Sequence, residues 1–97
     1  MKVKIGVIDF DIDFNADIED NILGEILHSE AKINIDNRDG KMPLQVQRRI
    51  LCHEIAHAIA PTLSSNELFA EALGQSLLQF IQDNPKVVKF LQRNKNE

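Results

Sequence analysis

Residues 44–60 read LQVQRRILCHEIAHAIA, and this stretch sets the plan of the chain. Its apolar side chains recur at helical spacing, which predicts an α-helix with one buried face. Pro43 suits the first turn of this helix, and Pro61 cannot continue it. The apolar positions are Leu44, Val46, Ile50, Leu51, Ile55, Ala58 and Ile59.

Helical spacing continues after Pro61. We expect Ser64 or Ser65 to cap a second helix, which ends near Asp83. A short third helix over 86–92 precedes a polar tail. The apolar residues of the second helix are Leu68, Phe69, Ala72, Leu73, Leu77, Phe80 and Ile81.

The residues before position 40 show strand periodicity instead. Residues 3–14 alternate apolar and polar side chains, with a phase shift near Val7 that indicates a bulge or a turn. Residues 22–28 and 31–36 predict two more strands, joined by a tight hairpin at Ser29. The predicted fold is α+β: a small antiparallel sheet followed by the 44–60 helix, an antiparallel second helix and a short third one. Residues 1–97 are expected to form a single domain.

Bulk composition excludes several classes of partner. The formal net charge is −4, so a global basic surface for nucleic acid is absent. No stretch approaches the roughly 20 apolar residues that span a bilayer. Cys52 is the single cysteine, which fits a reducing compartment, and we expect a cytoplasmic protein.

The sharpest chemical signal is the pattern His53-Glu54-Ile55-Ala56-His57. Histidines four residues apart lie on one face of a helix, where both imidazoles can reach one Zn²⁺ ion. Glu54 lies beside the metal and can accept a proton from a water molecule that the metal has made acidic. The pattern therefore predicts a zinc site with Glu54 as general base.

A catalytic zinc usually has three protein ligands, so one more is needed. Glu67 and Glu71 of the second helix share a face, and an antiparallel helix can bring either one to the histidines. We favour Glu71, because it lies deeper in the helix with Gln75 one turn on to hold it. Glu67 stays open as the alternative, although an acidic first-turn residue needs no metal.

Other polar residues are weaker candidates. An EF-hand loop starting at Asp9 would need Gly and Glu where Phe14 and Asp20 stand, so the acidic alternation fits a strand better. Such a strand could lie along a cleft and prefer basic substrates. Cys52 is expected to be a buried apolar residue, and His28 a partly exposed structural histidine.

The runs ILCHEIAHAI (50–59), EALGQSLL (71–78) and DNP (83–85) resemble the ImmA/IrrE-type metallopeptidases, in particular their short versions from phage and mobile-element genomes. Residue by residue, the resemblance implies a gluzincin-like site. His53, His57 and Glu71 would hold zinc, and Glu54 would be the catalytic glutamate. Gly74-Gln75 stands where the family usually has Ala-Asn.

The resulting hypothesis is a zinc-dependent metallopeptidase that hydrolyses a peptide bond in a protein or peptide substrate. One alternative is a metal-stabilised, non-catalytic binding or regulatory module of phage or mobile-element origin. A second is a metal-free interaction domain that uses the acidic strand or the C-terminal helix.

Overall fold

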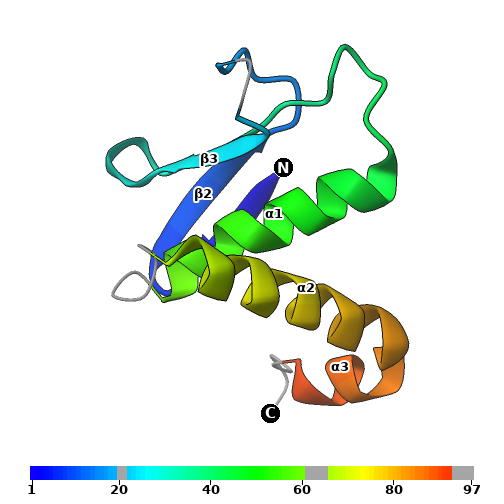
Figure 1. Ribbon diagram of the computed structural model, residues 1–97. Helices are drawn as coiled ribbons and strands as arrows, with labels where there is room; N and C mark the ends of the chain where they lie inside the picture. The colour runs from blue at the N-terminus through cyan, green and yellow to red at the C-terminus, as the bar shows by residue number, and fades with distance from the viewer. Residues whose placement is uncertain (20–21, 61–65, 93–97) are drawn as a thin grey trace.

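Strands and helices fall in separate halves of the chain, as the sequence predicts. The computed structural model describes residues 1–19, 22–60 and 66–92. In these ranges a four-stranded sheet comes first and three α-helices follow. Figure 1 shows the sheet, helix α1 and helix α2 as successive layers, with α3 beyond them. The fold is therefore α+β, and α1 is its central layer.

Residues 3–14 belong to a hairpin of two strands. β1 (Lys2–Ile5) pairs antiparallel with β2 (Ile8–Asp13), so the phase shift expected near Val7 is a turn. Gly6 adopts a φ of 64° in this turn, a conformation that costs glycine little. Along β2, buried apolar residues alternate with exposed acidic ones, which are Asp9, Asp11 and Asp13.

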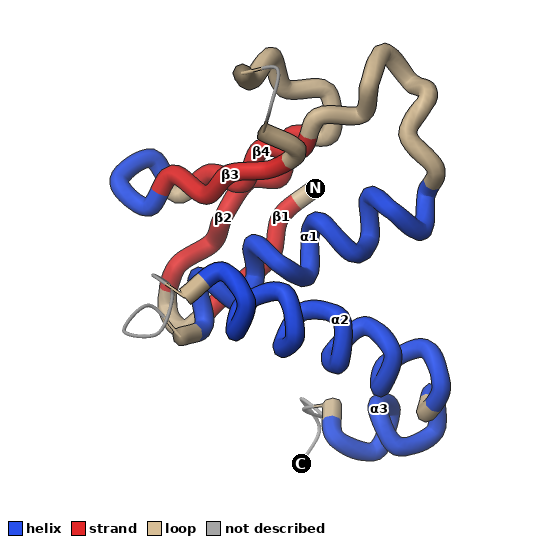
Figure 2. Tube along the Cα trace, in the orientation of Figure 1, coloured by secondary structure: helices blue, strands red, loops and turns tan. Residues whose placement is uncertain are grey.

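The sheet is mixed, which corrects the prediction of a purely antiparallel one. β3 (Gly24–Leu27) and β4 (Lys32–Ile35) form the expected antiparallel pair, joined by a short 3-10 helix, η1 (His28–Glu30). However, β4 also pairs in parallel with β2, and the strand order is β1-β2-β4-β3 (Figure 2). Ile33 and Ile35 have no exposed surface, so β4 is more stable inside the sheet than at its edge.

Helix α1 (Leu44–Ile59) packs across one face of the sheet, as its apolar spacing predicts. Ile50 of this helix packs in the core with the buried residues of the strands. Burying each side chain of this size stabilises a fold by about 1.5–3 kcal/mol. The core residues are Phe10, Ile12, Ile33, Ile35, Met42 and Ile50.

Helix α2 (Glu67–Asp83) runs back along α1, and α3 (Pro85–Leu91) follows it, close to the predicted 86–92. The expected caps Ser64 and Ser65 lie outside the described residues. The observed N-cap of α2 is Asn66, whose side chain accepts a 3.0 Å hydrogen bond from the backbone N–H of Phe69.

The two long helices are in close contact at Gly74. A Cβ atom added to Gly74 would lie 2.8 Å from the backbone nitrogen of His53 and 2.9 Å from the carbonyl carbon of Cys52. Only a residue without a side chain fits at this distance. The contact brings the start of α2 beside the histidine face of α1.

Candidate metal centre

The two histidines of α1 converge on one point. His53 and His57 stand four residues apart on the helix, and their Nε2 atoms are 3.1 Å apart. His57 is buried and His53 is half-buried. A helical turn therefore supplies two imidazole nitrogens to one site, as the spacing predicts.

Glu67 brings a carboxylate to both nitrogens from the first residue of α2. Its Oε2 lies 2.9 Å from Nε2 of His53, and its Oε1 lies 3.0 Å from Nε2 of His57. One donor atom from each of these three residues lies within 4.8 Å of the others. His53, His57 and Glu67 are thus close enough together to hold a metal ion.

The spacing of these donors fits a small tetrahedral metal site. Ligand atoms about 2.0–2.1 Å from a tetrahedral zinc are about 3.3 Å from one another. The three donor pairs are separated by 2.9, 3.0 and 3.1 Å, so a slight spreading admits an ion. Two imidazoles and one carboxylate also form a donor set known for catalytic zinc.

Glu71, the glutamate that the sequence favours as third ligand, lies on the other edge of the His53 ring. Its Oε2 is 2.6 Å from Nδ1 of His53. Gln75 donates a 2.5 Å hydrogen bond to its Oε1, and Nε of Arg49 lies 3.6 Å from the same oxygen. A carboxylate here favours the tautomer with its proton on Nδ1, so the Nε2 lone pair faces Glu67 and His57.

The choice between the two glutamates depends on where α2 begins. Their four-residue spacing places both on one face, so periodicity alone cannot separate them. The signal that favours Glu67 is Asn66, a strong N-cap residue that fixes Glu67 as the first residue of the helix. Glu67 is 71% exposed, which also shows that it is held by few contacts besides the histidines.

Neighbouring groups shift the pKa values of His53 and Glu71 in opposite directions. Burial lowers the pKa of His53, but its hydrogen bonds with Glu71 and Glu67 outweigh this and raise it overall. The hydrogen bond from Gln75 lowers the pKa of Glu71, and the contacts with His53 lower it further. The cluster is therefore electrostatically suited to a cation.

Glu54 is buried between α1 and β3, with 7% of its surface exposed. A Cβ on Gly24 of β3 would lie 2.6 Å from Cγ2 of Ile50 and 3.2 Å from Oε2 of Glu54, so this glycine makes room for both side chains. Burial raises the pKa of Glu54 to about 7; His53 lowers it and Glu67 raises it by smaller amounts. A carboxyl group with such a pKa can gain and lose a proton near neutral pH.

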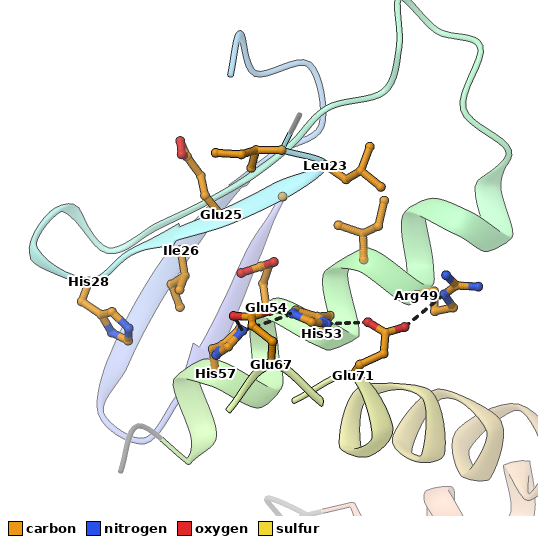
Figure 3. A pocket seen from close by; sticks show the side chains of 13 residues that line it. Leu23, Glu25, Ile26, His28, Arg49, His53, Glu54, His57, Glu67 and Glu71 are labelled. Atoms are coloured by element: carbon orange, nitrogen blue, oxygen red, sulfur yellow. Dashed lines mark hydrogen bonds and ion pairs between the residues drawn. The ribbon is translucent and has the colours of Figure 1, made fainter. Parts of the chain in front are cut away.

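These groups face a pocket of about 720 Å³ between the edge of the sheet and the two helices (Figure 3). One wall comes from residues 22–26 and His28. The opposite wall comes from α1 and the start of α2 and carries Arg49, Ile50, His53, Glu54, His57, Glu67 and Glu71.

The weaker sequence candidates lie elsewhere, apart from His28. The acidic side chains of β2 do not line this pocket, so the idea that they form a cleft edge is wrong. Cys52 is half-buried, and burial raises the pKa of its thiol, in keeping with an apolar role. His28 is exposed at the start of η1 and lines the pocket.

No family model, no curated protein and no solved structure matches this chain. Among the described residues, no helix is both long and apolar enough to cross a membrane. The geometry of the pocket is therefore the main structural basis for proposing a function.

Proposed function

We propose that this protein is a zinc-dependent peptidase whose metal ligands are His53, His57 and Glu67. The observation that carries the proposal is the convergence of these three donors beside the buried carboxyl of Glu54, in one open pocket. The resemblance to ImmA/IrrE-type metallopeptidases, stated above from the sequence, supports the same class of reaction. The resemblance implies Glu71 as the third zinc ligand, whereas the proposed third ligand is Glu67.

Each residue has a distinct role in the proposed reaction. A bound zinc ion would make water acidic and polarise the substrate carbonyl. Glu54 accepts the proton of the attacking water and passes it to the leaving amine as the C–N bond breaks. Glu71 holds the proton on Nδ1 of His53, and Arg49 and Gln75 hold Glu71 in turn.

An extended peptide is the substrate that fits the wall above the cluster. In the part of the chain that the structure describes, β3 ends the sheet. Leu23 O accepts a 2.9 Å hydrogen bond from Asp36 N, and inward and outward residues alternate in an antiparallel ladder. Gly24 and Ile26 therefore present their backbone groups outward, where a peptide strand can pair with them.

The test is metal content together with turnover. Protein purified without metal-affinity resin is analysed by elemental mass spectrometry and incubated with a mixture of unstructured peptides read by mass spectrometry. We expect about one zinc per chain, loss of zinc in His57→Ala, and retention of zinc with loss of cleavage in Glu54→Gln.

Two results would contradict the proposal. Wild-type protein that binds no zinc after zinc is added back has no such site. Cleavage by Glu54→Gln at the wild-type rate removes the role of Glu54, or reveals a contaminating peptidase.

A second candidate is the metal-stabilised binding module. It is favoured by the position of Glu67, which is mostly exposed and joins α2 to α1 through the histidines. In this case zinc would stabilise the folded protein and would have no part in catalysis. Normal zinc content and a lower melting temperature after chelation, with no cleavage of any peptide, would favour this candidate.

A further inference from the structure

The pocket has a polar side chain on its strand wall that the roles above do not use. Residues 22–26 and His28 form this wall, and the only polar side chains among them are those of Glu25 and His28. Figure 3 shows the Glu25 carboxylate directed away from the histidines, whereas the His28 ring lies on the His57 side of the pocket. His28 is therefore available to a molecule bound between the two walls.

One contact holds the backbone of His28 and another restrains its ring. Its backbone begins η1, and the carbonyl of His28 accepts a 3.2 Å hydrogen bond from the N–H of Ala31. Its ring stands edge-on against Phe10, with centroids 6.4 Å apart and an angle of 83° between the planes. Phe10 is a core residue with 3% of its surface exposed, so this contact restrains the imidazole from one side, although His28 itself is exposed.

Hydrolysis of an amide needs a hydrogen-bond donor for the negative charge that develops on the carbonyl oxygen. Most side chains that line the pocket cannot act as this donor. Arg49 is paired with Glu71, and His53 and His57 belong to the metal cluster. The sequence contains no Tyr and no Trp, so no phenol or indole is available.

We infer that His28 is a second catalytic residue, which donates a hydrogen bond from its imidazole to the oxyanion formed on the scissile carbonyl. This inference rests on the proposed peptidase function. The proton stays on the imidazole, and no covalent bond to His28 forms or breaks. A donor held in place before the reaction needs no reorganisation as the charge develops.

Three variants separate this role from packing. His28→Phe keeps an aromatic ring against Phe10 but has no donor. His28→Gln restores a neutral donor without the ring. Ser29→Ala changes the exposed neighbour, which does not line the pocket, and is the matched control.

The first measurement does not depend on turnover. Isothermal titration calorimetry measures the binding of an end-blocked tripeptide phosphonate, whose tetrahedral anion mimics the oxyanion, to zinc-loaded protein. We expect His28→Phe to weaken phosphonate binding about 100-fold, which is typical for the loss of one oxyanion donor. His28→Gln should recover part of this loss, and Ser29→Ala should bind like wild type.

The second measurement is the kinetics of a peptide that wild type cleaves. His28→Phe should lower kcat by a similar factor with little change in KM, because the contact exists mainly in the transition state. Wild-type phosphonate affinity and kcat in His28→Phe overturn the role of His28 and leave the peptidase standing. Loss of zinc in His28→Phe would mean that His28 is a metal ligand, and this result also overturns its role as oxyanion donor. Wild type that neither cleaves peptides nor binds the phosphonate overturns both proposals.

Discussion

Nδ1 of His53 lies 2.6 Å from Oε2 of Glu71, while Nε2 of the same ring faces His57 and Glu67. One imidazole is therefore held by a glutamate on each edge. A histidine that ligates metal through one nitrogen commonly donates its other N–H to a carboxylate, which fixes the tautomer and strengthens the ligand. In the proposed metal site, the two glutamates of α2 would consequently have different roles: Glu67 would bind the metal and Glu71 would orient His53.

This difference predicts unequal effects of two substitutions on zinc affinity. Glu71→Gln keeps a hydrogen-bond acceptor near Nδ1 but removes the charge, and it should weaken zinc binding about 10–100-fold. Glu67→Gln removes a ligand and should weaken binding further. Competition with a chromogenic chelator measures both affinities. Gln79→Ala, on the same helix but outside the pocket, is the control. A larger loss from Glu71→Gln than from Glu67→Gln would restore Glu71 as the third ligand.

The contact between α1 and α2 predicts an intolerant glycine. Gly74→Ala adds a Cβ within 2.8 Å of the backbone of His53, and backbone cannot rotate away as a side chain can. We expect a net loss of stability of about 1–3 kcal/mol from overpacking, although alanine favours helix by about 1 kcal/mol. Urea denaturation followed by circular dichroism measures it. Ser76→Ala, exposed on the same helix, should be neutral or slightly stabilising. A stabilised Gly74→Ala protein would show that the helices are not in such close contact.

The buried Glu54 predicts a pH dependence in the metal-free protein. Burial raises its pKa from 4.5 to about 7, so between these pH values the folded chain binds more protons than the unfolded chain. The free energy of unfolding should therefore fall as pH rises through this window. The raised pKa of His53 also makes the free energy of unfolding fall as pH rises. The lowered pKa of Glu71 affects the free energy of unfolding only at lower pH.

Glu54→Gln removes the first of these contributions. Its stability in the presence of a chelator should change less than that of wild type between pH 5 and pH 7, and should exceed it at pH 7. Urea titrations at pH 5, 6 and 7 test this. Parallel pH profiles for the two proteins would mean that Glu54 ionises in the folded chain as it does in the unfolded one.

The cap of α2 predicts a link between helix stability and metal binding. Asn66→Ala removes the side chain that accepts from the N–H of Phe69, which typically costs about 0.5–2 kcal/mol. Glu67 is the next residue, so fraying of this turn also moves a ligand. We expect zinc affinity to fall along with the melting temperature. Asn66→Asp, which can still cap, should keep both near wild type. Unchanged affinity in Asn66→Ala would mean that zinc itself orders the first turn.

The sequence predicts the helical half of the fold better than the sheet. Periodicity locates α1 because apolar spacing and Pro43 act locally, and the same argument places His53 and His57 together. It does not predict that β4 lies between β2 and β3, because this depends on how deeply Ile33 and Ile35 are buried after the whole sheet has formed.

The residues of the candidate site also differ in how far the sequence predicts them: some depend on local spacing and others on long-range packing. The role proposed for Glu54 follows from its place beside His53 in the sequence. The roles of Glu67 and Glu71 depend on the rotation and start of α2, which the approach at Gly74 and the cap at Asn66 determine. His28 reaches the pocket only through the pairing of β3 with β4, so its spacing from the helix motif in the sequence carries no signal.

The donors of the metal cluster come from two successive helices: the imidazoles from α1 and the carboxylate from the first residue of α2. This division imposes an order on assembly during translation. A nascent chain that has emerged only as far as residue 60 offers the two histidines of the cluster without Glu67, so the proposed zinc site would still be incomplete. If the proposed function is right, tight zinc binding and peptide hydrolysis would begin only once α2 has docked against α1.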